Sequence, residues 1–278
     1  VRRLRAAQRL HGTSLAPVSP AKESRACGLT QARVHRTHIF LLVAFLAGPV
    51  AAEDPVRVAV ASNFSRTFAE LVSHFSAETG IVVATTTGST GKLYAQIVNG
   101  APFDVFLAAD ANRPALLEAS GRVVPGSRIT YASGRLVLWS RDADDCLEAL
   151  HTSKWIALAN PETAPYGRAA QEFLQNANLW HDVSGRIAYA ENVMQVVQFV
   201  ASGNAGVGFV AASLLDSPYA PTGQCSWPIP SESHAPLEQQ AVLLSRANED
   251  ERVVRLFEFL QSDAAVNIIR KNGYGESK

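Results

Sequence analysis

The stretch IVVATTTGSTGKLYAQIVNGAPFDVFLAAD, residues 81–110, carries the pattern from which the fold is predicted. An apolar, β-rich run (81–87) leads through a turn bracketed by glycines into a helical run (92–100), and a second apolar run (103–110) follows. Uniformly apolar strands that are separated by helices are typical of parallel sheets covered on both faces. The stretch therefore predicts an α/β fold.

The rest of the chain continues this alternation. The run 56–62 precedes a segment whose apolar residues Phe68, Leu71, Val72 and Phe75 have helical spacing, and Gly80 closes that segment. Later apolar runs (135–140, 155–161, 186–190, 207–213 and 239–245) are interrupted by helix-like segments at 167–180 and 192–203. We predict a doubly wound α/β protein, with no repeat, low-complexity tract or transmembrane helix after residue 52.

The N-terminal segment has the order of a secretory signal. Arg33 and Arg36 precede the apolar run 39–48, and Pro49 and three small residues follow it. The run is too short to span a bilayer, so we expect a cleaved signal peptide rather than an uncleaved anchor, with cleavage after Ala52. Residues 1–52 are interpreted as leader and signal peptide, and residues 1–34 as the product of a start assigned too early.

Removing that segment changes the charge. The whole chain has 25 basic and 25 acidic residues, but residues 1–52 hold eight basic residues and one acid, Glu23. The exported part therefore has 17 basic and 24 acidic residues, a net charge of −7. No basic face for nucleic acid is expected, and a bound anion would have to be attracted by local groups.

Three cysteines are present, and Cys27 falls in the leader. Cys146 and Cys225 remain in an exported protein, where a disulfide is permitted. Two separate thiols are the alternative.

Four strand ends are candidate ligand contacts. In α/β sheets, ligands bind at the carboxyl ends of strands, where helix N-termini present free N–H groups. The four are Ser62-Asn63, Gly88-Ser89-Thr90-Gly91, the segment NPETAPYG (160–167) and Glu191-Asn192-Val193. Each could be only a helix cap. Four such ends in one chain favour a binding site, and the two glycines leave the backbone approachable.

The sequence supports nucleotide binding and catalysis less well than it supports a ligand site at these strand ends. The segment GSTGK resembles the end of a phosphate-binding loop, but Thr86 and Leu93 occupy the places of the required Gly and Ser/Thr. No Gly-x-Ser-x-Gly motif is present at this turn. Asp110 is interpreted as a helix cap and Asp104 as a strand-start residue. The histidines after residue 52 are isolated and lack metal-ligand spacing: His74, His151, His181 and His234.

Several motifs resemble the periplasmic molybdate-binding proteins of bacterial ABC importers. They are ASNF (61–64), GSTGKLYAQIVNGAPFDVFLAAD (88–110), NPETAPYG (160–167), SGNAGVGFVA (202–211) and FLQSDAAVNIIRKNGYG (259–275). The resemblance implies a type II periplasmic-binding-protein fold, in which two crossing strands join two lobes. The candidate crossings are 135–140 and 239–245. Residues 53–134 plus 240–278 would form lobe 1, and residues 135–239 would form lobe 2.

The resemblance also implies a set of ligand residues. Phe209 lacks the hydroxyl that one branch of the family uses, so Asn63 is expected to supply the missing donor. Thr90 is favoured over Ser89 as the direct contact, and both are kept. The full set is Ser62, Asn63, Ser89, Thr90, Tyr166, Asn192 and Val193. Molybdenum would be bound only as the oxyanion, through these residues.

The residue types agree with that chemistry. Molybdate is a dianion that only accepts hydrogen bonds, so its site should offer donors and no carboxylate. Tyr166 and Val193 fit as backbone N–H donors at helix starts. Phosphate carries a proton and would need an acceptor, for which Glu162 and Glu191 are the only candidates.

These expectations together describe a periplasmic binding protein rather than an enzyme. Its partners would be molybdate or tungstate and the membrane permease of an ABC importer. No cofactor and no nucleic acid are expected, and the protein is expected to be monomeric. The alternatives are a binding protein for another tetrahedral oxyanion such as sulfate, or an enzyme on the same fold that acts on a small anion.

Overall fold

The computed structural model describes residues 54–215, 223–247 and 249–275. The part of the chain from Ala52 onward forms one compact unit. The expected signal peptide, its cleavage site after Ala52 and Cys27 lie outside the described residues. Across the described ranges, no helix combines the length and the apolar composition needed to cross a membrane.

The first of two five-stranded sheets has the strand order β2-β1-β3-β10-β4. Its strands are β1 (Val56–Ala61), β2 (Val83–Gly88), β3 (Val105–Leu107), β4 (Ile129–Ser133) and β10 (Glu238–Leu243). Strand β1 runs parallel to β2 and β3, whereas β10 is antiparallel to β3 and β4. We call this sheet with its helices lobe 1.

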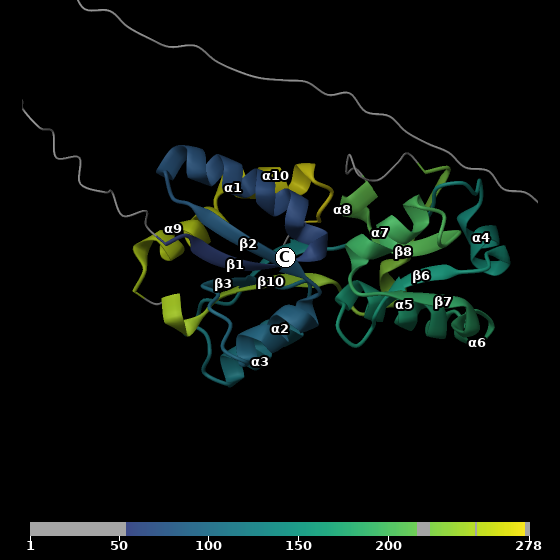
Figure 1. Ribbon diagram of the computed structural model, residues 1–278, viewed down its shortest axis with the longest axis horizontal. Helices are drawn as coiled ribbons and strands as arrows, with labels where there is room; N and C mark the ends of the chain where they lie inside the picture. Colours follow the sequence, from purple (N-terminus) through teal and green to yellow (C-terminus); the bar gives the residue numbers. More distant parts are fainter. Residues whose placement is uncertain (1–53, 216–222, 248, 276–278) are drawn as a thin grey trace, which may run out of the picture. The chain divides into compact units, whose positions relative to one another are not determined.

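Helices cover both faces of the first sheet because its central strands are apolar on both sides. Val58 and Val60 of β1 pack into one core, and Ala59 between them packs into another. Figure 1 shows α1 (Ser65–Thr79) and α10 (Asp263–Lys271) on one side of the sheet, and α2 (Thr90–Val98) and α3 (Asn112–Ala119) on the other. Helix α9 (Glu251–Phe259) contributes to the first core. Helix α1 ends as expected at Gly80, which has a left-handed φ of 73°.

The second sheet has the order β7-β6-β8-β5-β9 and, with its helices, forms lobe 2. The strands are β5 (Leu136–Ser140), β6 (Ile156–Ala159), β7 (Ile187–Ala190), β8 (Val207–Ala211) and β9 (Cys225–Pro228). The helices are α4 (Cys146–Thr152), α5 (Pro165–Asn176), α6 (Trp180–Val183), α7 (Val193–Ala201) and α8 (Ala212–Leu215). Short 3₁₀ helices complete the described chain: η1 (Ser62–Phe64), η2 (Ser184–Arg186), η3 (Ser231–Ser233) and η4 (Ser245–Ala247).

The chain crosses between the sheets at two places. It leaves lobe 1 between Ser133 and Leu136 and returns between Pro228 and Glu238. The backbone N–H of Gly134 donates to the carbonyl oxygen of Leu237 at 2.9 Å, which joins the two crossings. The predicted crossings, 135–140 and 239–245, are therefore displaced: those runs form β5 and β10, the strands that follow each crossing. All of β10 belongs to lobe 1, two residues before the expected boundary.

Both sheets are mixed, whereas the uniformly apolar strands of the sequence indicated parallel pairing. The parallel pairs are β1 with β2 and β3, and β6 with β7 and β8. Strands β10 and β5, which follow the crossings, pair antiparallel with their neighbours. An apolar run buried on both faces has the same composition in either direction, so the sequence pattern could not distinguish them.

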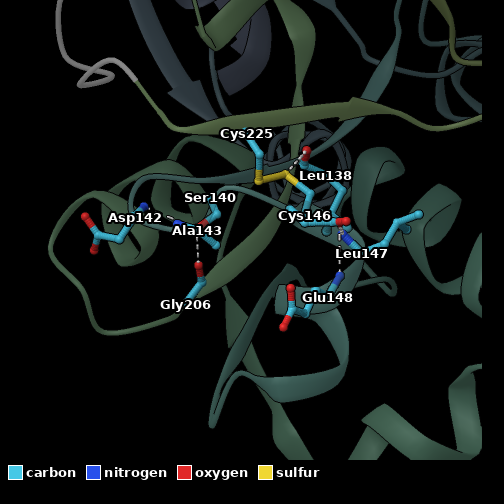
Figure 2. Close-up of a disulfide and its surroundings, with 10 residues drawn as sticks. Leu138, Ser140, Asp142, Ala143, Cys146, Leu147, Glu148, Gly206 and Cys225 are labelled. Atoms are coloured by element: carbon cyan, nitrogen blue, oxygen red, sulfur yellow. Dashed lines mark hydrogen bonds between the residues drawn. A yellow bond between two sulfur atoms is a disulfide. The ribbon is translucent and has the colours of Figure 1, made fainter.

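Cys146 and Cys225 form a disulfide with an S–S distance of 2.04 Å (Figure 2). It links the first residue of α4 to the first residue of β9, which is an edge strand of lobe 2. Asp145 caps α4 by accepting hydrogen bonds from the backbone N–H groups of Leu147 and Glu148. The bridge therefore fastens an edge strand to a capped helix.

Candidate ligand-binding site

A small cavity lies between the two lobes, and the seven ligand residues expected from the sequence all line it. The volume open to the centre of a water-sized sphere is about 10 Å³, so there is room for one small species. Lobe 1 contributes Ala61, Ser62, Asn63, Gly88, Ser89, Thr90 and Ala109, and lobe 2 contributes Ala164, Pro165, Tyr166, Asn192 and Val193. None of these described lining residues carries a charge.

Three helices begin at the cavity wall: α2 at Thr90, α5 at Pro165 and α7 at Val193. The first N–H groups of a helix have no acceptor within it, and the helix dipole makes this end positive. Pro165 occupies the first position of α5 and has no N–H, so Tyr166 carries the first donor of that helix. The geometry suits an anion held by main-chain groups of both lobes.

The Ser89 hydroxyl is buried at the cavity wall and lacks a hydrogen-bond partner among the described residues. The residue is 3% exposed and occupies the N-cap position of α2, yet its hydroxyl makes no cap hydrogen bond. Its Oγ atom is buried without any hydrogen-bond partner in the described structure. A buried hydroxyl without a partner is energetically costly, which indicates that something else completes its hydrogen bonding.

Thr90, the residue favoured from the sequence, is engaged differently. Its Oγ1 accepts a hydrogen bond of 3.0 Å from the backbone N–H of Ala109. This bond ties the start of α2 to the segment that follows β3. The Thr90 hydroxyl therefore has a structural partner that the Ser89 hydroxyl lacks.

Two asparagines of the expected set use their side chains within the protein. Asn192 is the N-cap of α7 and accepts from the backbone N–H of Gln195 at 3.1 Å. The Asn63 amide nitrogen donates to Gln239 at 2.9 Å and to the Tyr274 hydroxyl at 3.2 Å. Both amide hydrogens of Asn63 thus have acceptors, so its main-chain N–H is the donor left to offer a ligand.

Ser62, Tyr166 and Phe209 complete the set of residues considered from the sequence. Ser62 is buried at the start of η1, and its hydroxyl makes no hydrogen bond to any described residue. The Tyr166 hydroxyl accepts from Gln239, and burial raises the pKa of this phenol well above its usual value. Phe209 is buried against Phe173 and does not line the cavity.

Three further contacts join residues of lobe 1 and lobe 2 near the cavity wall. The backbone N–H of Gly91 donates to the carbonyl oxygen of Thr163 at 2.8 Å. The Arg113 guanidinium donates to the carbonyl oxygen of Glu162 at 2.9 Å. A salt bridge of 2.6 Å joins Lys92 to Glu191.

The carboxylates of Glu162 and Glu191, the two candidate acceptors for a phosphate proton, do not line the cavity. The carboxylate of Glu191 pairs with Lys92, and Glu162 is exposed. Neither residue is among those that line the cavity. The described residues that line this cavity therefore include no carboxylate, and Glu191 lines the adjoining pocket that shares Ser62, Gly88 and Asn192 with it.

The titratable groups set aside from the sequence lie elsewhere. Asp104 pairs with Arg246 at 2.8 Å, and Asp110 accepts from the backbone N–H of Arg113 in the first turn of α3. In the described ranges, no group of three or more His, Cys, Asp or Glu residues could hold a metal ion. His74 lies beside Glu78 on α1.

Sequence reasoning missed the small residues of the wall and one buried polar residue behind it. Alanines and prolines at strand and helix ends carry no chemical signal, although their position next to the predicted contacts could have indicated them. Gln239 lies behind the wall and is fully buried. Its signal was the pair Gln239-Gln240 at the start of an otherwise apolar strand.

Two α/β lobes that enclose a small cavity of hydrogen-bond donors define the two-lobed class of solute-binding proteins. The family model described as "Bacterial extracellular solute-binding protein" matches residues 56–275. The chain belongs to this family.

Individual relatives are similar over most of their length. The chain is 40% identical over 243 residues to molybdate-binding protein ModA of Azotobacter vinelandii, an alignment that covers 84% of this chain and 96% of that protein. It is 41% identical over 237 residues to ModA of Rhodobacter capsulatus, covering 84% and 92%. The solved structure of the periplasmic molybdate-binding protein of Azotobacter vinelandii superposes with a TM-score of 0.76 at 36% identity, covering 80% of this chain and 100% of that one.

Proposed function

We propose that this protein captures molybdate, and also tungstate, between its two lobes and delivers the oxyanion to the membrane permease of an ABC importer. It acts outside the cytoplasm, in the periplasm, as a monomer and without catalysis. Relatives at about 40% identity are molybdate-binding proteins, which supports this assignment.

The observation that carries the proposal is a small cavity between the lobes whose wall offers donors and no charge, with the Ser89 hydroxyl buried and unpartnered at that wall. A tetrahedral dianion presents four oxygens, all of them acceptors. The proposed donors are the hydroxyls of Ser62 and Ser89 and the main-chain N–H groups of Asn63, Tyr166 and Val193. We thus assign the direct hydroxyl contact of α2 to Ser89 in place of Thr90, and the role of Asn192 to capping.

The expected affinity is high. A hydrogen bond to a charged group contributes about 1.5–3 kcal/mol, so about five donors allow dissociation constants from micromolar to nanomolar after the cost of lobe closure. Neutral donors fixed by helix starts suit an anion that remains a dianion at neutral pH. They suit hydrogen phosphate less well, because its proton needs an acceptor.

Thermal unfolding with four anions tests the proposal. Molybdate and tungstate at micromolar concentration should raise the unfolding temperature, because a ligand specific to the folded state stabilises it. Sulfate and phosphate at the same concentration should leave it unchanged. An equal shift with phosphate contradicts the all-donor site, and a shift with sulfate alone makes the protein a sulfate-binding protein.

A further inference from the structure

The side chain of Gln239 lies where the two lobes and the two crossings meet. Gln239 is the second residue of β10 and is fully buried. The pairing of β10 with β4 shifts its register between Gln239 and Gln240. The side chains of the two glutamines bond to different groups, and of the two only that of Gln239 bonds to residues of the cavity wall.

The Gln239 amide touches one cavity residue from each lobe. Its Oε1 accepts from the Asn63 side-chain amide at 2.9 Å and from the Tyr131 hydroxyl at 3.1 Å. Its Nε2 donates to the Tyr166 hydroxyl at 3.1 Å. One side chain thus holds Asn63 of lobe 1 and Tyr166 of lobe 2 at the same time.

The crossings are packed against the same groups. A Cβ atom added to Gly134, in the first crossing, would lie 2.2 Å from the Tyr166 hydroxyl and 2.8 Å from Gln239 Nε2. Gly134 is also hydrogen-bonded to Leu237 of the second crossing. A rotation of one lobe about the crossings must therefore change the hydrogen bonds of Gln239.

Asn63 is held from lobe 2 by a second route. The Tyr274 hydroxyl donates to the carbonyl oxygen of Asn63 at 2.7 Å, and the Ser213 hydroxyl of lobe 2 donates to Tyr274 at 3.0 Å. The main chain of Asn63, which carries the proposed donor, is thus fixed through buried polar groups of both lobes.

We propose that Gln239 is a positioning residue that couples closure of the lobes to the alignment of the Asn63 and Tyr166 donors. This inference rests on the proposed function, because the coupling matters only if an oxyanion is held by both residues. Gln239 does not touch the ligand; it sets the relative position of two groups that do.

Two substitutions in the same strand separate positioning from general stability. Gln239→Met keeps the length of the side chain and removes all three hydrogen bonds. Gln240→Met is the matched control, since Gln240 is also buried and is bonded to Thr130 and Arg128, away from the cavity. We expect Gln239→Met to weaken molybdate binding at least about tenfold by calorimetry, and Gln240→Met to bind like the parent even if both lower the unfolding temperature.

Tyr166→Phe provides a second route if Gln239→Met does not fold. It removes only the hydroxyl that Gln239 contacts and keeps the main-chain donor, so its affinity should also fall. Combined with Gln239→Met, the two losses should be less than additive, because each breaks the same contact.

The outcomes separate the inference from the function. The positioning role is overturned if Tyr166→Phe binds molybdate as tightly as the parent. It is also overturned if Gln239→Met and Gln240→Met lose the same affinity, and in both cases molybdate binding by the parent stands. A parent protein that fails to bind molybdate overturns the proposed function itself.

Discussion

Gly91 of lobe 1 lies so close to Thr163 of lobe 2 that its backbone N–H donates a 2.8 Å hydrogen bond to the Thr163 carbonyl oxygen. A Cβ atom at Gly91 would lie 2.9 Å from both Cα and the carbonyl oxygen of Thr163. Backbone atoms on the far lobe cannot move aside as a flexible side chain can. The closed arrangement of the lobes therefore requires glycine at this position.

Gly91→Ala should weaken molybdate binding by about tenfold or more, because the lobes must separate to admit the methyl group. The isolated helix should gain up to about 1 kcal/mol from alanine, so lost affinity would not reflect a weakened α2. Calorimetric titration measures the effect. Gly185→Ala is the control, since an added Cβ there meets no atom within 4 Å. Parent affinity in Gly91→Ala would show that closure does not need this contact.

Ser89→Ala and Thr90→Val should have opposite effects on stability and on molybdate affinity. Ser89→Ala removes a buried hydroxyl without a protein partner, so stability should hold or rise while molybdate affinity falls about tenfold or more. Thr90→Val leaves the Ala109 N–H without its acceptor and should cost about 1–3 kcal/mol of stability, with the smaller effect on affinity. Denaturant unfolding and calorimetry compare them. The reverse profile would return the contact to Thr90.

Val193→Pro should remove a lobe 2 donor without breaking its helix. Val193 is the first residue of α7, where proline is tolerated, and the extended backbone of Asn192 suits a residue before proline. The same position of α5 already holds Pro165. We expect a modest loss of stability without ligand, because the buried Val193 side chain packs in the lobe 2 core, and a loss of affinity of about tenfold. Binding as tight as in the parent would exclude the Val193 N–H as a donor.

Reduction of the disulfide should destabilise lobe 2 without abolishing the site. Cys146 and Cys225 are 79 residues apart, and a disulfide typically contributes about 2–4 kcal/mol to stability. Thiol labelling of unfolded, unreduced protein that begins at residue 53 should find no reactive sulfur. Two labelled thiols would contradict the pairing. Cys146→Ala with Cys225→Ala should reproduce the stability of the reduced protein.

Stability should fall at alkaline pH because three phenols are buried. Burial raises the pKa of Tyr131, Tyr166 and Tyr274 above the usual 10.0. The unfolded chain loses these protons near pH 10 whereas the folded protein keeps them, so the free energy of unfolding is retained below pH 10 and declines above it. Each phenol contributes up to about 1.4 kcal/mol per pH unit.

Denaturant unfolding across this range, with phenolate absorbance, measures the decline. Tyr274→Phe should make the decline of the unfolding free energy with pH shallower by the contribution of one phenol. If all native tyrosines ionise together near pH 10, the three hydroxyls are not buried as described.

The sequence by itself determined the class of fold and the segments of the site. Apolar runs separated by amphipathic helices can bury their surface only as sheets covered on both faces, and Gly80 marks a helix end by its backbone geometry. Polar residues after strands pointed to Ser62, Ser89 and Asn192, because strand ends that lead into helices collect at one edge of a sheet. All of this is local information, available from spacing and residue type.

Tertiary structure decided which hydrogen-bond donor of each residue is free to contact a ligand. Whether Ser89 or Thr90 contacts a ligand depends on Ala109, which lies 19 residues beyond Thr90 and supplies the partner that only Thr90 has. The role of Gln239 depends on Asn63 and Tyr166, which are far from it along the chain and on different lobes. The directions of β5 and β10 likewise follow from the crossings. Hydrogen-bond partners brought together by folding are not encoded in the spacing of any one segment. The sequence therefore indicated residues that line the cavity, and the fold determines which of their donors are free.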